Sequence, residues 1–326
     1  MYLRHLRVQH LKLLRDVQLD FQEADSETPR LWTVIIGQNG TGKTSLLQAI
    51  ALAAAGSLQV NTLAGSTVGH LRDRRGPDPM RVEAEFELFQ APQPAGRRKA
   101  AASRGRAVRR LRSEVWLAER ESTIRARARF EPAQPGDDPL DDARSHNLPG
   151  WFVAGYGVAR FLPAVGAGAS LNRPAIERMQ PLFDPTQGLT STNFSRYYGD
   201  DSQKALRFHR ILKRTLLNAE GLLPDIVDLE LRGQGGVTSP GDLLERDRFA
   251  QQVGALKPLK IPGVALAHGY QSTIAWLADL VGHVLLESSV DLEPEAMEGL
   301  VLIDVLDLYL HPVWQATLIP ALRKTF

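Results

Sequence analysis

The chain has 326 residues, is 43% hydrophobic and 23% charged, and carries a formal net charge of +2. This is the composition of an ordinary globular protein of one large or two small domains, and the mild basicity alone does not imply nucleic acid. The absence of cysteine excludes disulfides and cysteine-based zinc sites. The N-terminus lacks the apolar stretch of a secretory signal, and no run reaches about 18 apolar residues. We therefore expect a cytoplasmic protein with no membrane contact.

The first 56 residues predict a strand pair, a buried strand and a helix. Residues 2–21 alternate apolar and polar side chains in two short runs, which is typical of a β-hairpin. Residues 31–36, LWTVII, form a continuous apolar run, which predicts a strand buried on both faces. Apolar side chains recur at helical spacing over residues 43–55, and Gly56 suits the C-terminal cap of that helix.

A basic segment separates two further alternating runs. Residues 80–90 and 114–132 alternate like strands, and residues 97–112 between them hold eight basic side chains and no acidic one. The simplest interpretation is two strands joined by a basic loop. Contact of loop 97–112 with DNA phosphates is one hypothesis for it. A solvated surface loop is the alternative, since no aromatic residue for base stacking lies within it.

The second half of the chain predicts helices and strands in alternation. Residues 203–222 and 272–287 repeat apolar residues at helical spacing. Short apolar runs at 151–160 and 300–304 predict buried strands, and a last helix begins near Pro312.

The segment from Gly37 to Thr44, GQNGTGKT, fits the pattern G-x-x-x-x-G-K-[ST] between the predicted strand and helix. Glycines let the backbone curl so that successive N–H groups point at phosphate oxygens, and the helix adds its positive N-terminal end. In such a loop Lys43 reaches the β- and γ-phosphates and the Thr44 hydroxyl binds Mg²⁺. A glycine-rich turn with a surface lysine is the alternative. The predicted nucleotide-binding residues of this segment are Gly37, Gln38, Asn39, Gly40, Thr41, Gly42, Lys43, Thr44 and Ser45.

Asp304 is the natural second ligand of the metal. It follows the apolar run of the 300–304 strand, and in this class of protein a carboxylate at such a strand end completes the Mg²⁺ shell. An aspartate that only caps the next helix is the alternative. We predict Mg²⁺ bound by Thr44 and Asp304 and no further metal, because the eight histidines show no metal-ligand spacing.

Four stretches of the chain carry a family resemblance. They are GQNGTGKTSLLQAIALA from Gly37, VAGYGVAR from Val153, LAHGYQSTIAWLADLV from Leu266 and VLIDVLDLYLHPVWQ from Val301. Together they resemble the ABC-type ATPases of the SMC/RecF/OLD group, and more closely the stand-alone AAA-family ATPases of bacterial defence loci. The resemblance implies an α/β P-loop NTPase fold, in which an ABC/SMC-like ATPase head has a mixed sheet flanked by helices and a helical insertion.

The resemblance also implies a single ATPase domain over residues 1–326. Its N-terminal lobe, 1–165, would hold the Walker A motif and the basic loop, and a helical insertion would occupy 166–255. Residues 256–326 would hold the signature segment and the Walker B strand that ends in Asp304. The family has a further strand and a T-H-S-P histidine beyond this point, so we expect a truncated chain or a fragment.

In the family, two subunits form a dimer around two ATP molecules, and each signature segment faces the nucleotide of the opposite subunit. By resemblance, Gly269 and a helix from about Ser272 would close the site across a homodimer, with backbone amides meeting the γ-phosphate. Ala267 stands where the family usually has a hydroxyl-bearing residue. One contact to the nucleotide is therefore expected to be lost.

Val305 is the largest departure from the family pattern. The family has a glutamate here that deprotonates the attacking water, and such general-base catalysis is worth about 10²–10⁴-fold. Valine cannot supply it. Asp307 and His311 lie nearby in sequence, and either is a candidate for partial replacement; Asp307 alternatively only orients the next helix. The predicted catalytic residues are Lys43, Asp304 and Asp307.

These observations predict a protein that binds Mg·ATP, dimerises around it and hydrolyses it slowly. Hydrolysis would switch a partner effector, such as a nuclease or toxin-like protein, or a DNA-acting machine. The alternative is a catalytically degenerate module that binds ATP without hydrolysing it. A kinase or nucleotide transferase is a more distant hypothesis, against which the Gly269 segment and the sequence after Asp304 argue. A role in phage defence rests on the resemblance alone.

Overall fold

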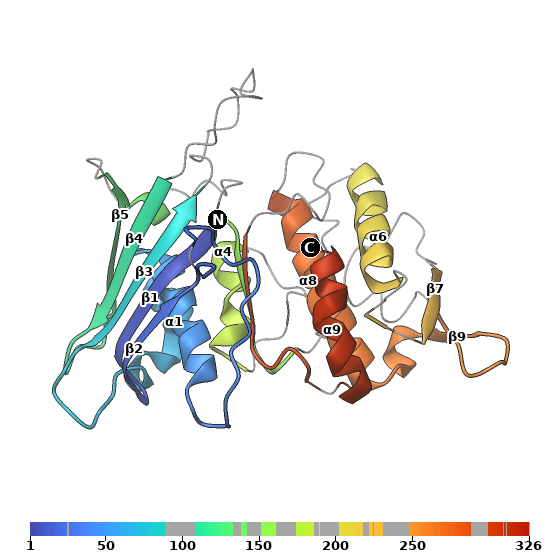
Figure 1. Cartoon of the computed structure of the whole chain (residues 1–326), viewed down its shortest axis with the longest axis horizontal. Helices are drawn as coiled ribbons and strands as arrows, with labels where there is room; N and C mark the ends of the chain where they lie inside the picture. The colour runs from blue at the N-terminus through green and yellow to red at the C-terminus, as the bar shows by residue number, and fades with distance from the viewer. Residues whose placement is uncertain are drawn as a thin grey trace, which may run out of the picture. The chain divides into compact units, whose positions relative to one another are not determined.

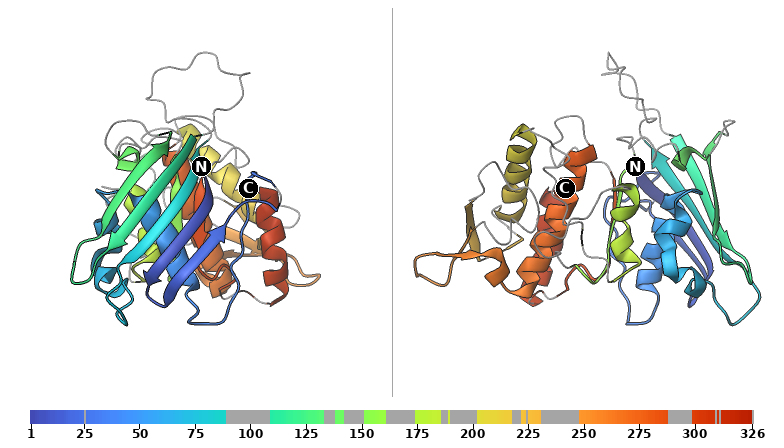
Figure 2. Two further views of the ribbon diagram at one scale, coloured as in Figure 1. Left: turned by 60° about the vertical axis from the view of Figure 1, so that its left-hand side comes forward. Right: turned by 180° about the vertical axis from the view of Figure 1, so that it is seen from behind.

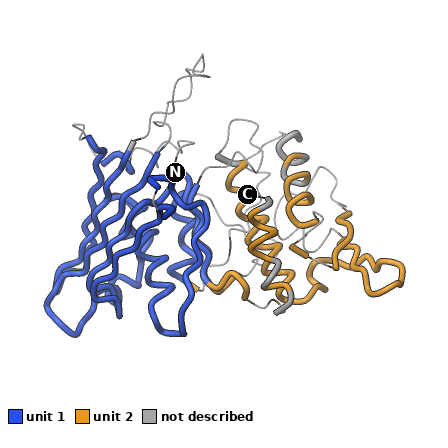
Figure 3. Tube along the Cα trace, in the orientation of Figure 1, with its two compact units in different colours: residues 1–157, 175–184, 298–304 blue, residues 158–174, 185–297, 305–326 orange. Residues whose placement is uncertain are grey.

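The chain is described by a computed structural model in which contacts divide it into two compact units (Figure 3). Unit 1 comprises Met1–Gly157, Ala175–Asp184 and Glu298–Asp304, and unit 2 comprises Val158–Pro174, Pro185–Met297 and Val305–Phe326. The structure describes residues 1–24, 26–88, 109–132, 138–141, 151–160, 174–185, 189, 202–217, 222–223, 225–230, 248–287, 299–308, 310 and 312–325.

Unit 1 is built on a five-stranded antiparallel sheet with the strand order β2-β1-β3-β4-β5 (Figure 2). Side chains alternate between its faces, so that Val82, Ala84 and Phe86 of β3 are all buried on one face. The predicted hairpin at residues 2–21 is confirmed, because β1 and β2 pair antiparallel. The strands are β1 (Tyr2–Leu11), β2 (Leu14–Asp20), β3 (Met80–Leu88), β4 (Arg109–Leu117) and β5 (Arg125–Glu131).

The prediction of a single strand over 114–132 is wrong. The structure forms two strands there, β4 and β5, and Arg120 between them has a left-handed backbone (φ +65°). Five consecutive polar residues, 119–123, interrupt the alternation at this turn, so the sequence held a signal for it that the prediction missed. The predicted loop 97–112 is also too long, because residues 109–112 belong to β4, while residues 97–108 lie outside the described residues.

Helix α1 (Lys43–Ala55) confirms the predicted helix and lies between two sheets. It contacts β1, β3 and β4 on one side, and on the other a parallel pair formed by β6 (Val153–Tyr156) and β10 (Leu300–Ile303) (Figures 1 and 2). A helix covered from both sides buries most of its surface, and all five alanines of this helix are 0% exposed. Small side chains let both layers approach the helix closely. The Ser113 hydroxyl of β4 donates to the Ala53 carbonyl at 2.6 Å.

The apolar run 31–36 does not form the predicted strand. It has no strand assignment, and Leu31, Val34 and Ile36 are 74%, 56% and 89% exposed. A strand needs a neighbouring backbone to complete its hydrogen bonds, and β6 and β10 pair only with each other in the described chain. The predicted strand before the glycine-rich loop is therefore wrong, whereas the predicted helix after it is confirmed.

Unit 2 contains three main helices and a small antiparallel sheet of order β7-β8-β9. The ring of Tyr270 on α8 packs on that of Trp314 on α9, with centroids 4.7 Å apart, and its hydroxyl donates to Asp225 at 3.0 Å. The three predicted helices are confirmed, although α8 begins four residues before the expected start at Ser272. These elements are α6 (Ser202–Leu217), α8 (His268–Glu287), α9 (Pro312–Thr325), β7 (Ile226–Glu230), β8 (Arg248–Gln251) and β9 (Leu259–Pro262).

The predicted α/β class is confirmed, with parallel and antiparallel strands in separate sheets. The segment 166–255, expected as a helical insertion, contains α6 but also β7 and β8. None of the helices that the structure describes is long and apolar enough to cross a membrane. The remaining short elements are α2 (Val60–Ala64), η1 (Gly65–His70), α4 (Pro174–Glu177), η2 (Gln180–Leu182) and η3 (Gly263–Ala265).

The apolar face of the five-stranded sheet gives a stability prediction. Phe86 is 0% exposed and meets Trp151 edge-to-face, with ring centroids 5.3 Å apart. We expect Phe86→Ala to lower the free energy of unfolding by about 3–5 kcal/mol, because it leaves a cavity in the core. Urea denaturation followed by tryptophan fluorescence measures this. Leu13→Ala, at a side chain that is 61% exposed, is the control and should change stability by less than about 0.5 kcal/mol. Equal effects of both substitutions would contradict the assigned core.

Candidate nucleotide-binding site

The glycine-rich loop from Gly37 to Gly42 has the backbone that a phosphate cradle requires. Gly40 and Gly42 have φ values of +79° and +96°, in the left-handed region that side chains disfavour. A Cβ added to Gly42 would also lie 2.7 Å from a methyl group of Leu14 on β2. The loop residues 37–41 are exposed, and among their N–H groups that of Thr41 donates to the Gln38 carbonyl at 3.4 Å.

Lys43 folds back across this loop. Its Nζ donates to the Gly37 carbonyl and to the Gln38 carbonyl, both at 2.7 Å. The ammonium group is thus held at the open side of the loop by neutral acceptors. Charged phosphate oxygens form stronger hydrogen bonds than carbonyls, so a bound polyphosphate would compete well for this group.

Thr44 and Asp304 are brought together from positions 260 residues apart in the sequence. The Thr44 hydroxyl donates to Asp304 Oδ2 at 2.7 Å. In an octahedral Mg²⁺ shell with bonds of 2.0–2.1 Å, neighbouring ligand oxygens lie about 2.9 Å apart. The two predicted magnesium ligands therefore already stand at the spacing that the ion requires, and both are oxygen donors of the kind it prefers.

The parallel strand pair fixes the position of Asp304. β10 pairs with β6 from Leu300↔Val153 to Ile303↔Tyr156, and the Asp304 N–H then donates to the Tyr156 carbonyl at 2.8 Å. Asp304 is 5% exposed and Tyr156 is 0% exposed. The buried carboxylate thus follows β10, of which only Leu302 is buried and Val301 is exposed, so the prediction of a fully buried strand is wrong there, while the position of Asp304 at the strand end is as predicted.

Gln48 is a residue at this site that the sequence analysis missed. Its amide donates to the Leu182 carbonyl at 2.9 Å and accepts from Lys12 Nζ at 2.7 Å, one turn after Thr44. Burial lowers the pKa of Lys12 from its ordinary value. A glutamine within an apolar helix does suggest an internal hydrogen-bonding role. Here its side chain connects α1 to the turn between β1 and β2 and to η2.

Val305, at the position of the expected glutamate, has an unusual backbone. Its φ is +49°, although a β-branched residue strongly disfavours this region, and its side chain is 40% exposed. Arg160 is 6% exposed and donates from Nη2 to the Val305 carbonyl at 2.6 Å. The bond holds a conformation that costs about 1–3 kcal/mol. Arg160 therefore supports the backbone immediately after Asp304, a contact that the sequence did not predict.

Of the other predicted site residues, Asp307 and Gly269 belong to unit 2 and Ser45 belongs to unit 1. Asp307 is exposed in a turn of unit 2, and its carbonyl accepts from the Leu310 N–H at 3.1 Å. Gly269 is buried in the first turn of α8, where its carbonyl accepts from the Thr273 hydroxyl at 2.9 Å. Ser45 is buried in α1, so its side chain faces the interior of unit 1. His311 lies outside the described residues.

The positive φ of Gly42 gives a prediction for nucleotide binding. We expect Gly42→Ala to weaken binding of a fluorescent ATP analogue by at least tenfold, because the methyl group meets Leu14 and the left-handed backbone is strained. Equilibrium fluorescence titration measures this. Gly69→Ala is the matched control, since its nearest new neighbour would be Arg74 at 3.9 Å. Unchanged binding by Gly42→Ala would argue against a phosphate cradle.

The Thr44–Asp304 pair gives a prediction for metal dependence. Asp304→Asn removes a charged Mg²⁺ ligand but keeps an acceptor for the Thr44 hydroxyl. We expect the variant to lose most of the increase in ATP affinity that Mg²⁺ gives to the parent chain, while its affinity for metal-free ATP stays similar. Titrations with Mg²⁺ and with EDTA measure the two affinities. A full response of the variant to Mg²⁺ would place the metal elsewhere.

The chain is similar to two curated bacterial proteins. Over all of its length the chain is 23% identical to "Septu protein PtuA" of Bacillus mycoides (strain KBAB4), of which it covers 36%. It is 41% identical over 61 residues to the "Retron Ec83 probable ATPase" of Escherichia coli, a segment that is 19% of this chain and 11% of the retron protein. The chain thus spans well under half of the length of these curated relatives.

The family comparison covers nearly the whole chain. Residues 32–325 match the family described as "AAA domain, putative AbiEii toxin, Type IV TA system". The matched range includes the glycine-rich loop, both predicted magnesium ligands and the segment around Gly269. The chain therefore belongs to this family of AAA-domain P-loop ATPases.

Proposed function

We propose that the chain binds Mg·ATP, dimerises around the nucleotide and hydrolyses it slowly. The observation that carries this proposal is the 2.7 Å contact between Thr44 and Asp304, because it joins the loop that would hold phosphates to a buried carboxylate. A structural glycine-rich turn has no need of such a partner. Membership of the AAA-domain family supports ATP as the nucleotide.

The residues of unit 1 have distinct roles in this proposal. The N–H groups of residues 37–42 and the N-terminus of α1 would bind phosphate oxygens, and Lys43 would leave its loop carbonyls for the β- and γ-phosphates. Thr44 and Asp304 would hold Mg²⁺, which supplies charge neutralisation at the phosphates when bound. Positioning and electrostatic stabilisation thus account for most of the expected catalysis.

The second part of the proposal concerns dimerisation and partner proteins. A second copy would bring Gly269 and the N-terminus of α8 to the nucleotide, as the resemblance implies. Gly269 is buried in the single chain, so this role would require its backbone N–H to become accessible when the two copies meet. We further propose that the cycle switches a partner effector in bacterial defence against phage. The names of the Septu and retron relatives support this role.

A catalytically silent module is the second candidate, and Val305 favours it. An exposed valine stands immediately after the metal ligand, where the general base is expected, and it cannot activate water. Asp307 is exposed one turn later and is the substitute that the sequence offers. A silent module would bind ATP and hold the dimer closed without turnover.

Phosphate release from Mg·ATP distinguishes the two candidates. We expect slow turnover by the parent chain, above the blank set by Lys43→Ala, and at least a tenfold increase in Val305→Glu, since general-base help is worth about 10²–10⁴-fold. Asp307→Asn tests the substitute base and should lower the parent rate if Asp307 acts on water. Fluorescence titration with an ATP analogue confirms that each variant other than the blank binds nucleotide.

The slow ATPase and the silent module predict different results. A parent chain that binds ATP but releases no phosphate, with activity restored by Val305→Glu, would identify the silent module. Failure of the parent chain to bind ATP at all would exclude both candidates. Val305→Gln is the matched control for the added side chain, because it has nearly the size of glutamate and cannot act as a base.

A further inference from the structure

The outer face of β4 and β5 in unit 1 carries a row of arginines. Alternation along β5 places Arg125, Arg127 and Arg129 on the exposed face of an edge strand, and the side chains of Arg125 and Arg127 are each 63% exposed. Arg110 and Arg112 of β4 lie on the same face, with side chains 41% and 43% exposed. None of these five residues has a role in the nucleotide site.

Most of these arginines are matched by carboxylates. Arg125 Nη2 donates to Glu121 at 2.9 Å, and Arg127 Nε donates to Glu114 at 2.9 Å. Arg127 also lies over the ring of Trp116, 5.7 Å from its centroid. These two arginines are already held in defined positions by the sheet around them.

Arg112 and Arg129 form the exception. The register of the sheet places them directly opposite each other, and like charges in that position repel. Within the described chain Arg129 has no carboxylate within 4.0 Å. Arg112 reaches Glu131 only at 3.4 Å and Glu85 only at 3.9 Å, both longer than the 2.7–2.9 Å typical of charge-assisted hydrogen bonds.

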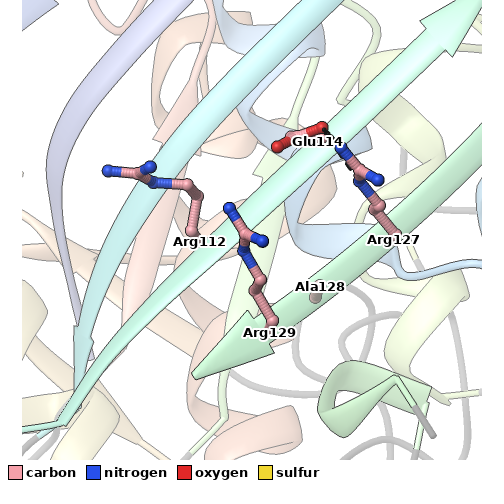
Figure 4. Close-up of a pocket in the computed structure, with 5 residues that line it drawn as sticks. All are labelled: Arg112, Glu114, Arg127, Ala128 and Arg129. Carbon is pink, nitrogen blue, oxygen red and sulfur yellow. Dashed lines mark hydrogen bonds and ion pairs between the residues drawn. The ribbon is translucent and has the colours of Figure 1, made fainter. Parts of the chain in front are cut away.

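These side chains line a shallow pocket. Its walls are Arg112, Glu114, Arg127, Ala128 and Arg129, and Figure 4 shows the Glu114 carboxylate beside the Arg127 guanidinium, with the Arg129 guanidinium apart from that pair. Ala128 lines the pocket through its backbone, because its side chain lies on the opposite face of the sheet and packs against the core. The Glu114 carboxylate occupies one end of the pocket, so an anion would bind at the other end, between Arg112 and Arg129. There its charge would reduce the repulsion between the two guanidinium groups, and its oxygens would accept hydrogen bonds from their N–H groups.

We propose that Arg112 and Arg129, with Arg127 beside them, bind a phosphate group of a ligand from outside the chain. The planar guanidinium forms paired hydrogen bonds with carboxylate and phosphate alike. A phosphate carries more charge and more acceptor oxygens than a carboxylate, so it can serve two guanidinium groups at once. The phosphate belongs either to the backbone of a nucleic acid or to a small phosphorylated molecule. The site is distinct from the loop at Gly37–Thr44 and does not depend on ATP binding there.

Fluorescence anisotropy of a labelled single-stranded oligonucleotide tests the site, with unlabelled pyrophosphate as the competitor. We expect the double variant Arg112→Gln, Arg129→Gln to bind the oligonucleotide about tenfold or more weakly at 0.1 M salt, with a salt slope reduced by about one to two. The double variant Arg112→Lys, Arg129→Lys should keep most of the binding, because lysine retains the charge. Lys43→Ala should bind the oligonucleotide like the parent chain.

The matched control removes two cations from exposed positions of α6, as Arg210→Gln with Lys213→Gln. Competition by pyrophosphate would identify a site for a single phosphate group, and binding without competition would identify a nucleic-acid backbone as the ligand. The proposal is overturned if neither probe binds the parent chain, if the glutamine variant binds like the parent, or if the α6 control or the lysine variant loses as much as the glutamine variant. Those results would leave the row as solvated charge that protects a sheet edge.

Discussion

The hydrogen bond between Thr44 and Asp304 is the contact on which the site of unit 1 depends. It requires that α1 begin at the end of the glycine-rich loop and that β10 end beside that helix. The register of the parallel pair β10 and β6 sets the position of Asp304 along the strand direction. The hydrogen bond from the Asp304 N–H to the Tyr156 carbonyl fixes its backbone. The two oxygens are thus positioned by the buried helix α1 and by the pairing of β10 with buried β6.

Helix α1 connects stability with function in this arrangement. Its alanine-rich sequence lets it pack between the five-stranded sheet and the parallel pair, while its first turn carries Lys43 and Thr44. Gln48 extends the same constraint, because its amide joins the β1–β2 turn and η2 through one buried side chain. A helix buried on both sides has little freedom to shift, so Thr44 and the loop before it keep their orientation.

The sequence predicted the parts of this site that depend on local pattern. The spacing of Gly37, Gly42, Lys43 and Thr44 identified the loop, and alternation identified the hairpin at 2–21. The errors arose where the outcome depends on distant partners. The apolar run 31–36 has the composition of a buried strand but has no neighbouring strand among the described residues. The turn around Arg120 was missed for another reason, because the five polar residues 119–123 that interrupt the alternation there were not read as a break. The arginine pair across β4 and β5 requires a strand register, which composition alone does not give.

The order in which the segments of unit 1 occur along the chain has a consequence for its synthesis. The last segment of unit 1, Glu298–Asp304, follows more than a hundred residues that belong mainly to unit 2. A ribosome synthesises the glycine-rich loop before α6 and α8, and Asp304 only after them. The nascent chain therefore carries Thr44 without its hydrogen-bond partner while these two helices are made. That contact can form only after β10 has been made and has paired with β6, so unit 1 is completed later than most of unit 2.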